Sequence, residues 1–160
     1  TITSRPRSGT VIEVEVPTHV SATLDMASGA VVTMVMSFDV WKAELPRIEV
    51  HGSRGSLQVP DPNGTGGPVR IFRAGAKAWE EVALTHGYRE ISHSTGVADM
   101  AYALRTGRPH RASGELAAHV LDAMHAVHES ASTGRRVALS TTVRRPAPLP
   151  LGLRDGVLDD

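Results

Sequence analysis

The hydrophobic pattern of this 160-residue chain changes period once, and that change constrains the fold more than any other feature. Through the first half, apolar side chains recur at every second position, which is typical of strands with one face toward a core. From residue 96 onward they recur at helical spacing in two long stretches. Strands followed by helices, rather than alternating with them, predict an α+β fold with a predominantly antiparallel sheet and helices on one of its faces.

Strict alternation predicts a first strand in "TVIEVEVP" and a second in "HVSATLDM", after which "ASGA" has the composition of a tight hairpin turn. The next stretch, "AVVTMVMSFDV", is apolar on both faces, so a strand there needs cover on both sides. "RIEVHGSRGSLQVPDPN" predicts two short strands around a G-x-x-G connection. "PVRIFRAG" and "AWEEVAL" predict two more, and the early half is therefore an antiparallel meander.

The first helical stripe contains Val97, Met100 and Leu104, and Gly107 followed by Pro109 predicts its end. Ser113 is the expected N-cap of a second helix, which Gly134 should stop. "RRVAL" could add an edge strand after it. We expect the Pro-rich tail that follows to be either extended along a neighbouring surface or disordered.

Composition excludes several classes of function. The 17 basic residues balance 17 acidic ones, so no net field attracts phosphate backbones or anionic lipid, and we expect neither a nucleic-acid nor a membrane partner. No apolar run is long enough for a membrane span, and no signal-peptide stretch opens the chain. The absence of cysteine excludes disulfides and thiolate catalysis and fits a cytoplasmic location. Because the chain opens without Met in a polar segment, we expect a fragment.

Two local patterns suggest ligand chemistry but fail closer inspection. His119, His125 and His128 lie on the second predicted helix near Asp122, yet this spacing supplies at most two good metal ligands, so we predict no metal site. The glycines of "NGTGGP" could cradle a phosphate, but no helix follows them and no Lys-Ser/Thr pair completes a P-loop. An ordinary loop is the favoured interpretation.

Other polar residues leave alternatives open. Asp99, three residues before Tyr102 on the first predicted helix, could cap nearby backbone or face a bound polyol, and the structural role is favoured. Trp41 and Lys42 follow a strand end, where they could flank a sugar or anchor an interface. His93 and Ser94 are adjacent in sequence, but no nucleophile elbow accompanies them, so a hydrolase is disfavoured.

Three strings in order resemble one family: "THVSATLDMASGAVVTMVMSFDVW", "IEVHGSRGSLQVPDPN" and "GVADMAYALRTGRPHRASGELAAHVLDAMHAVHESASTGRRV". Together they are similar to the C-terminal domain of the Gfo/Idh/MocA oxidoreductases, whose fold is an open-faced antiparallel sheet of the dihydrodipicolinate-reductase type. The similarity runs from about residue 11 to residue 145. It implies an interdomain connection at 1–10, a substrate and oligomerisation domain at 11–139, and a tail at 140–160.

The resemblance implies a two-domain enzyme in which an N-terminal Rossmann domain binds NAD or NADP. The present domain would then form one side of a pocket that binds a sugar, an inositol or a related polyol. The family's glycine fingerprint, its Lys in Glu-Lys-Pro and its D-x-G-x-[HY] segment have no match here. We therefore expect the Rossmann domain to be absent from this chain, which alone should bind no cofactor and hold no catalytic residue.

The resemblance also implies roles for named residues. A homo-oligomer should form through the open sheet face that carries Val31, Thr33 and Val35. The expected substrate-binding residues are Trp41, Arg89, His93, Ser94 and Asp99. The alternative is a stand-alone dimerisation or small-ligand-binding module with no redox activity.

Overall fold

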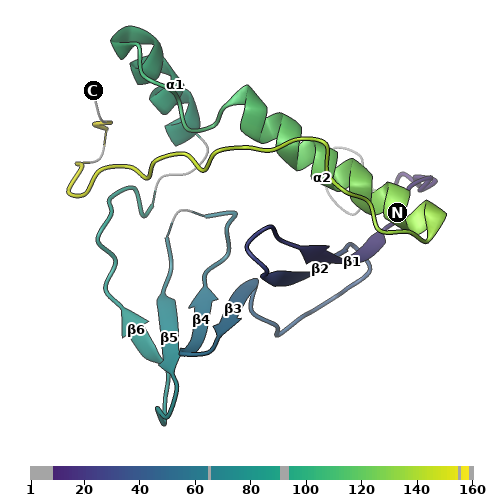
Figure 1. Cartoon of the computed structure of the whole chain (residues 1–160). Coiled ribbons are helices and arrows are strands. Elements are labelled where there is room, and N and C mark those ends of the chain that lie inside the picture. Colours follow the sequence, from purple (N-terminus) through teal and green to yellow (C-terminus); the bar gives the residue numbers. More distant parts are fainter. Residues whose placement is uncertain (1–8, 65, 91–93, 155, 159–160) are drawn as a thin grey trace. The chain divides into compact units, whose positions relative to one another are not determined.

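A computed structural model describes residues 9–64, 66–90, 94–154 and 156–158 (Figure 1). The chain divides into two compact units, with the boundary between Glu44 and Leu45. Each unit contains antiparallel strands, and the second also contains two helices. The prediction of an α+β fold with antiparallel strands followed by helices is confirmed.

The first unit is built on one hairpin. Strands β1 (His19–Asp25) and β2 (Val31–Ser37) pair antiparallel, with Ala22 opposite Met34. The predicted turn joins them, because the Met26 N–H donates to the Ala30 carbonyl at 2.9 Å and closes the hairpin. This register places the apolar side chains of β1 on the same face as Val32, Met34 and Met36, whereas Val31 and Val35 lie on the other face.

The predicted strand at "TVIEVEVP" is wrong. Residues 11–16 belong to no strand, and Val11 and Val16 are 75% and 71% exposed. Alternation shows that a segment has an apolar face, but a strand also needs a hydrogen-bonding neighbour, and none pairs with this segment among the described residues. The edge strand considered for "RRVAL" is absent for the same reason, since residues 135–139 join no ladder.

The second unit opens with a four-stranded antiparallel meander (Figure 1). Its strands are β3 (Ile48–Gly52), β4 (Gly55–Val59), β5 (Val69–Arg73) and β6 (Glu80–Val82), in that spatial order. The rings of Phe72 and Trp79 pack edge to face across the β5–β6 connection, with centroids 5.6 Å apart. In the described part of the chain, this sheet and the β1–β2 hairpin are separate ladders.

Helices α1 (Ser94–Thr106) and α2 (Gly114–Thr133) follow the sheet, and both sequence-predicted caps of α2 are present. Ser113 accepts a hydrogen bond from the Leu116 N–H, and Gly134 ends the helix with a φ of 66°, a conformation that glycine adopts without strain. Neither helix, nor any other helical stretch in the described residues, is long and apolar enough to cross a bilayer.

Buried apolar side chains are few among the described residues. They are Tyr88, Ala103, Ala126 and Leu158, all in the second unit. Large apolar side chains of the first unit are exposed instead, with Phe38 at 95% and Trp41 at 104%. Packing of the helices on a sheet face stays a prediction.

Candidate functional site

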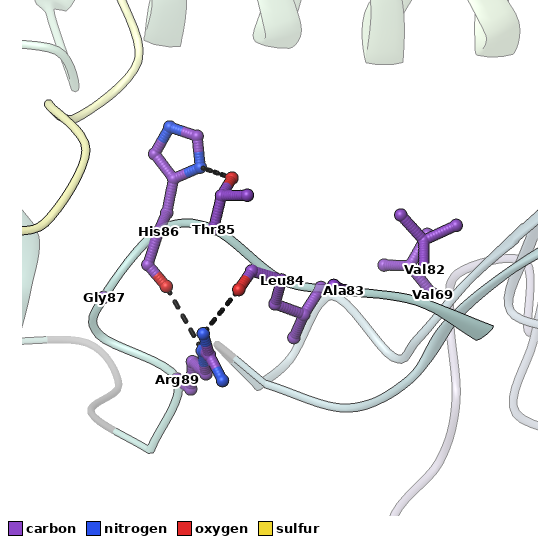
Figure 2. A pocket seen from close by; sticks show the side chains of 8 residues that line it. All are labelled: Val69, Val82, Ala83, Leu84, Thr85, His86, Gly87 and Arg89. Atoms are coloured by element: carbon purple, nitrogen blue, oxygen red, sulfur yellow. Dashed lines mark hydrogen bonds between the residues drawn. The ribbon is translucent and has the colours of Figure 1, made fainter.

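The loop that follows β6 forms the candidate site. Where β6 ends at Val82, the chain continues through Ala83–Arg89 and lines an open pocket of about 300 Å³ (Figure 2). Val69 and Val82 lie on the apolar side of the pocket, because they are cross-strand neighbours on β5 and β6. This volume is at the lower end of the range for small-molecule sites.

Arg89 supplies the positive charge of the pocket. Its Nη2 donates to the Leu84 carbonyl at 2.6 Å, and its Nε donates to the His86 carbonyl at 3.2 Å (Figure 2). A guanidinium has five N–H donors, so three remain, two on Nη1 and one on Nη2. The two carbonyls therefore fix the plane of the group and leave its end available for a ligand.

Thr85 and His86 add neutral hydrogen-bonding groups. The Thr85 hydroxyl and the His86 Nδ1 lie 3.1 Å apart, and both side chains are exposed. Figure 2 shows the imidazole directed away from the Arg89 guanidinium. The pocket thus combines an apolar wall, a fixed cation and a polar pair.

The backbone around Arg89 is tightly constrained. Tyr88 has a φ of 61°, which is strained for a residue with a side chain, yet its ring is buried and its hydroxyl donates to the Val157 carbonyl at 2.5 Å. A Cβ placed on Gly66 would lie 2.1 Å from the Arg89 carbonyl oxygen, and one on Gly87 would lie 2.6 Å from the Leu153 carbonyl oxygen. The Gly-rich loop and the tail therefore both pack against the Arg89 segment at distances that only glycine permits.

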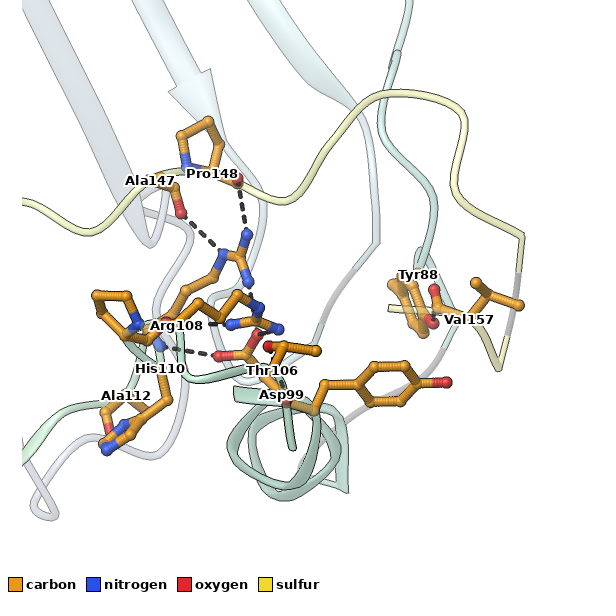
Figure 3. Close-up of polar contacts among 12 residues, drawn as sticks. Tyr88, Asp99, Thr106, Arg108, His110, Ala112, Ala147, Pro148 and Val157 are labelled. Atoms are coloured by element: carbon orange, nitrogen blue, oxygen red, sulfur yellow. Dashed lines mark hydrogen bonds and ion pairs between the residues drawn. The ribbon is translucent and has the colours of Figure 1, made fainter. Parts of the chain in front are cut away.

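A second polar cluster surrounds Asp99 at the junction between the helices (Figure 3). The Asp99 side chain is almost fully buried, and its Oδ1 accepts from Arg108 Nη2 at 2.8 Å and from Arg111 Nη1 at 2.5 Å. Its Oδ2 accepts from the Arg111 N–H at 2.8 Å. Arg111 also donates to the carbonyls of Ala147 and Pro148, so this carboxylate connects α1, the Gly-Arg-Pro loop and the tail.

Burial and hydrogen bonding act in opposite directions on the pKa of Asp99. Burial alone would raise this pKa, but the Arg111 N–H and the guanidinium groups of Arg108 and Arg111 stabilise the carboxylate more strongly. The pKa of Asp99 is therefore below its usual value. A charged carboxylate that accepts several hydrogen bonds from cationic groups stabilises the folded state.

The tail also forms hydrogen bonds with α2, in addition to its contacts with Tyr88 and Arg111. Asp122 Oδ2 accepts from both the N–H and the hydroxyl of Thr141, at 3.0 and 2.7 Å, and Ser140 adds two longer bonds. The Thr141 hydroxyl and N–H hold the pKa of Asp122 below its usual value. His119 Nδ1 lies 2.9 Å from the same hydroxyl. Of the two alternatives for the tail, the extended one is observed, and one helix histidine binds it.

The structure disperses the predicted substrate-binding residues. Arg89 lines the pocket, Ser94 is exposed at the first turn of α1, and Asp99 faces its two arginines. Trp41 lies in the first unit with its ring in solvent, and His93 is outside the described residues. No contact between Arg89, Ser94 and Asp99 is present within the described chain, so their joint role in substrate binding stays a prediction.

Sequence reasoning missed the partners that give these residues their roles. The spacing of Arg108 and Arg111 in "GRPHR" was a usable signal, since two arginines beside a helix end can enclose a carboxylate. Tyr88 had no such signal, because its strained backbone depends on tail residues about seventy positions away.

Comparison with known families decides the assignment of the N-terminal part. Residues 1–58 match the family model of the GFO/IDH/MocA C-terminal domain. Over these residues the chain is similar to that domain. The match includes the β1–β2 hairpin and the β3–β4 connection, and the predicted family is confirmed by it. No curated protein and no solved structure matches the chain significantly.

Proposed function

We propose that this chain is the substrate-binding and oligomerisation domain of an NAD(P)-dependent oxidoreductase that acts on a sugar, an inositol or a related polyol. The match to the GFO/IDH/MocA C-terminal domain carries the proposal. The pocket after β6 supports it, because an apolar wall beside a few fixed polar groups suits a small hydroxylated molecule. We place the protein in the cytoplasm, since it has no cysteine.

The cofactor does not fit the residues described here. A dinucleotide site of the Rossmann type needs parallel strands joined through a helix, with a glycine turn at the helix start. Every strand pairing in the described chain is antiparallel, and both helices come after the last strand. NAD or NADP would therefore be held by an N-terminal Rossmann domain, and the present residues would bind and orient the substrate.

Oligomerisation is proposed through the β1–β2 hairpin. A two-stranded hairpin alone is marginally stable in water. Here both of its faces are accessible, with Val31 and Val35 65% and 59% exposed on one face and Met36 62% exposed on the other. A two-fold contact between copies would bury the face with Val31, Thr33 and Val35 by symmetry.

The alternative is a stand-alone module that dimerises or binds a small ligand without redox activity. The exposed hairpin and the pocket would serve such a module equally well. NADH fluorescence separates the two functions. Residues 1–160 alone should give no saturable change, whereas the same chain produced with its upstream coding sequence should give one. Tight NADH binding by residues 1–160 alone would refute the proposal that the cofactor binds upstream and the substrate binds here. If the upstream segment adds no binding, the alternative holds.

A further inference from the structure

The geometry of Arg89 points to an oxyanion on the substrate, and we infer that the pocket after β6 takes a polyol that carries a carboxylate or phosphate group. The polyol part of this inference rests on the proposed function. The oxyanion part rests on the Arg89 contacts alone.

The unoccupied donors of Arg89 have the arrangement that an oxyanion needs. Nε and Nη2 use one edge of the guanidinium on the carbonyls of His86 and Leu84. The opposite end keeps N–H groups on both Nη1 and Nη2, which are parallel donors that match the two oxygens of a carboxylate or phosphate. A neutral hydroxyl can also accept from these donors, but only an oxyanion forms hydrogen bonds that are charge-assisted at both ends.

Arg89 differs from the four arginines of its unit that form ion pairs with acids. Arg108 and Arg111 bind Asp99, while Arg47 and Arg73 form ion pairs with Asp61 and Glu80. In the described residues the Arg89 guanidinium contacts only neutral carbonyl oxygens. A cation that no internal acid neutralises, and that lines a pocket, is suited to an external anion.

The site is built before a ligand arrives. Tyr88 keeps a strained φ of 61° because its buried ring and its bond to Val157 hold it, and Gly66 contacts the Arg89 carbonyl directly. Fixing a long side chain in advance reduces the entropy lost on binding. Val69, Val82 and Leu84 then offer apolar surface to the carbon skeleton of the polyol.

Calorimetric titration of the 160-residue protein with three probes tests the inference. The probes are neutral glucitol, gluconate with a carboxylate, and glucose 6-phosphate with a phosphate. We expect gluconate or glucose 6-phosphate to bind more tightly than glucitol, and the comparison of the two anions identifies the group. Amide shifts of Thr85, His86 and Arg89 in NMR spectra should locate the binding.

Variants assign the binding to the guanidinium. Arg89→Met should weaken binding of the preferred anion by about tenfold or more and affect glucitol much less, because only the anion forms charge-assisted bonds to the paired donors. Arg89→Lys keeps the charge and should retain part of the affinity. This variant therefore distinguishes loss of the guanidinium from misfolding of Arg89→Met. Arg145→Met, which removes an exposed arginine outside the pocket, should bind like the parent.

Equal affinity for all three probes, no binding of either anion, or unchanged anion binding by Arg89→Met would overturn the inference. These outcomes are separable from the proposed function. If the protein with its upstream sequence binds NADH but residues 1–160 ignore both anions, only the oxyanion is wrong. If Arg89 binds the anion while no NADH binding is found, the pocket stands and the redox role fails.

Discussion

Replacing Asp99 by Asn should destabilise the helical half of the second unit. The carboxylate accepts three hydrogen bonds from Arg108 and Arg111, two of them from guanidinium groups whose side chains are only 18% and 20% exposed. Asn keeps the size of the side chain but loses the charge. It also presents an NH2 group to N–H donors on one side of the cluster.

The expected loss follows from these contacts. Removing one member of a buried ion pair costs about 3–5 kcal/mol, and partial exposure of the two arginines lowers this to about 3 kcal/mol. For a chain of this length, that loss corresponds to a fall of about 6–12 °C in the melting temperature. Connection of the tail should also weaken, because Arg111 holds the Ala147 and Pro148 carbonyls.

Thermal melting followed by the helical circular dichroism signal at neutral pH measures the effect. Glu129→Gln is the matched control, since it also neutralises an acid on a helix but at an exposed position, and it should melt within about 2 °C of the parent because surface substitutions have small effects. If D99N melted as the control does, the argument that Asp99 organises the helix junction would be refuted.

Three further predictions concern the loop, the acid response and the hairpin. Gly66→Ala should lower both the melting temperature and the affinity for the anion, because its Cβ would lie 2.1 Å from the Arg89 carbonyl oxygen. Gly64→Ala is the control, since its Cβ would be 3.8 Å from the nearest atom outside its neighbours. Equal behaviour of the two variants would contradict the close packing of Gly66 against Arg89. Because the folded-state pKa of Asp99 is lowered, its contribution to stability is present above the unfolded pKa of about 4 and is lost as the pH falls through the folded value. The melting temperature should therefore drop more steeply below about pH 4 in the parent than in D99N. Parallel curves for the two proteins would contradict a stabilising role of the Asp99 carboxylate. Val35→Asp should shift sedimentation toward a smaller species, because it places a charge on the face of β2 that carries Val31 and Val35. Ser28→Asp in the turn is the control and should leave sedimentation unchanged. An unchanged assembly in Val35→Asp would exclude this face as the contact between copies.

Features encoded locally could be predicted from the sequence. The Ser113 cap, the Gly134 stop and the "ASGA" turn each depend on a few neighbouring residues, and all three are present. The family could also be identified from strings in order, although its model matches only residues 1–58.

Features that depend on a distant partner could not be predicted. "TVIEVEVP" has the alternation of a strand but no neighbour with which to pair. Asp99 carried two open interpretations because its partners, Arg108 and Arg111, become neighbours only after the chain turns at Gly107. Arg89 could be named as a candidate, but its orientation depends on Gly66, Tyr88 and the tail. Sequence pattern indicates which residues need partners, whereas tertiary structure determines which partners they meet.

Transfer of deuterium is the most direct test of the central claim, which is that residues 1–160 supply the substrate side of a hydride-transfer enzyme. Polyols deuterated at their hydroxyl-bearing carbons are incubated with NAD or NADP and the protein produced with its upstream coding sequence, and the nicotinamide is examined by mass spectrometry. The account predicts deuterated NADH or NADPH only when residues 1–160 are present. Equal transfer by the upstream segment alone, or no transfer from any polyol, would contradict it.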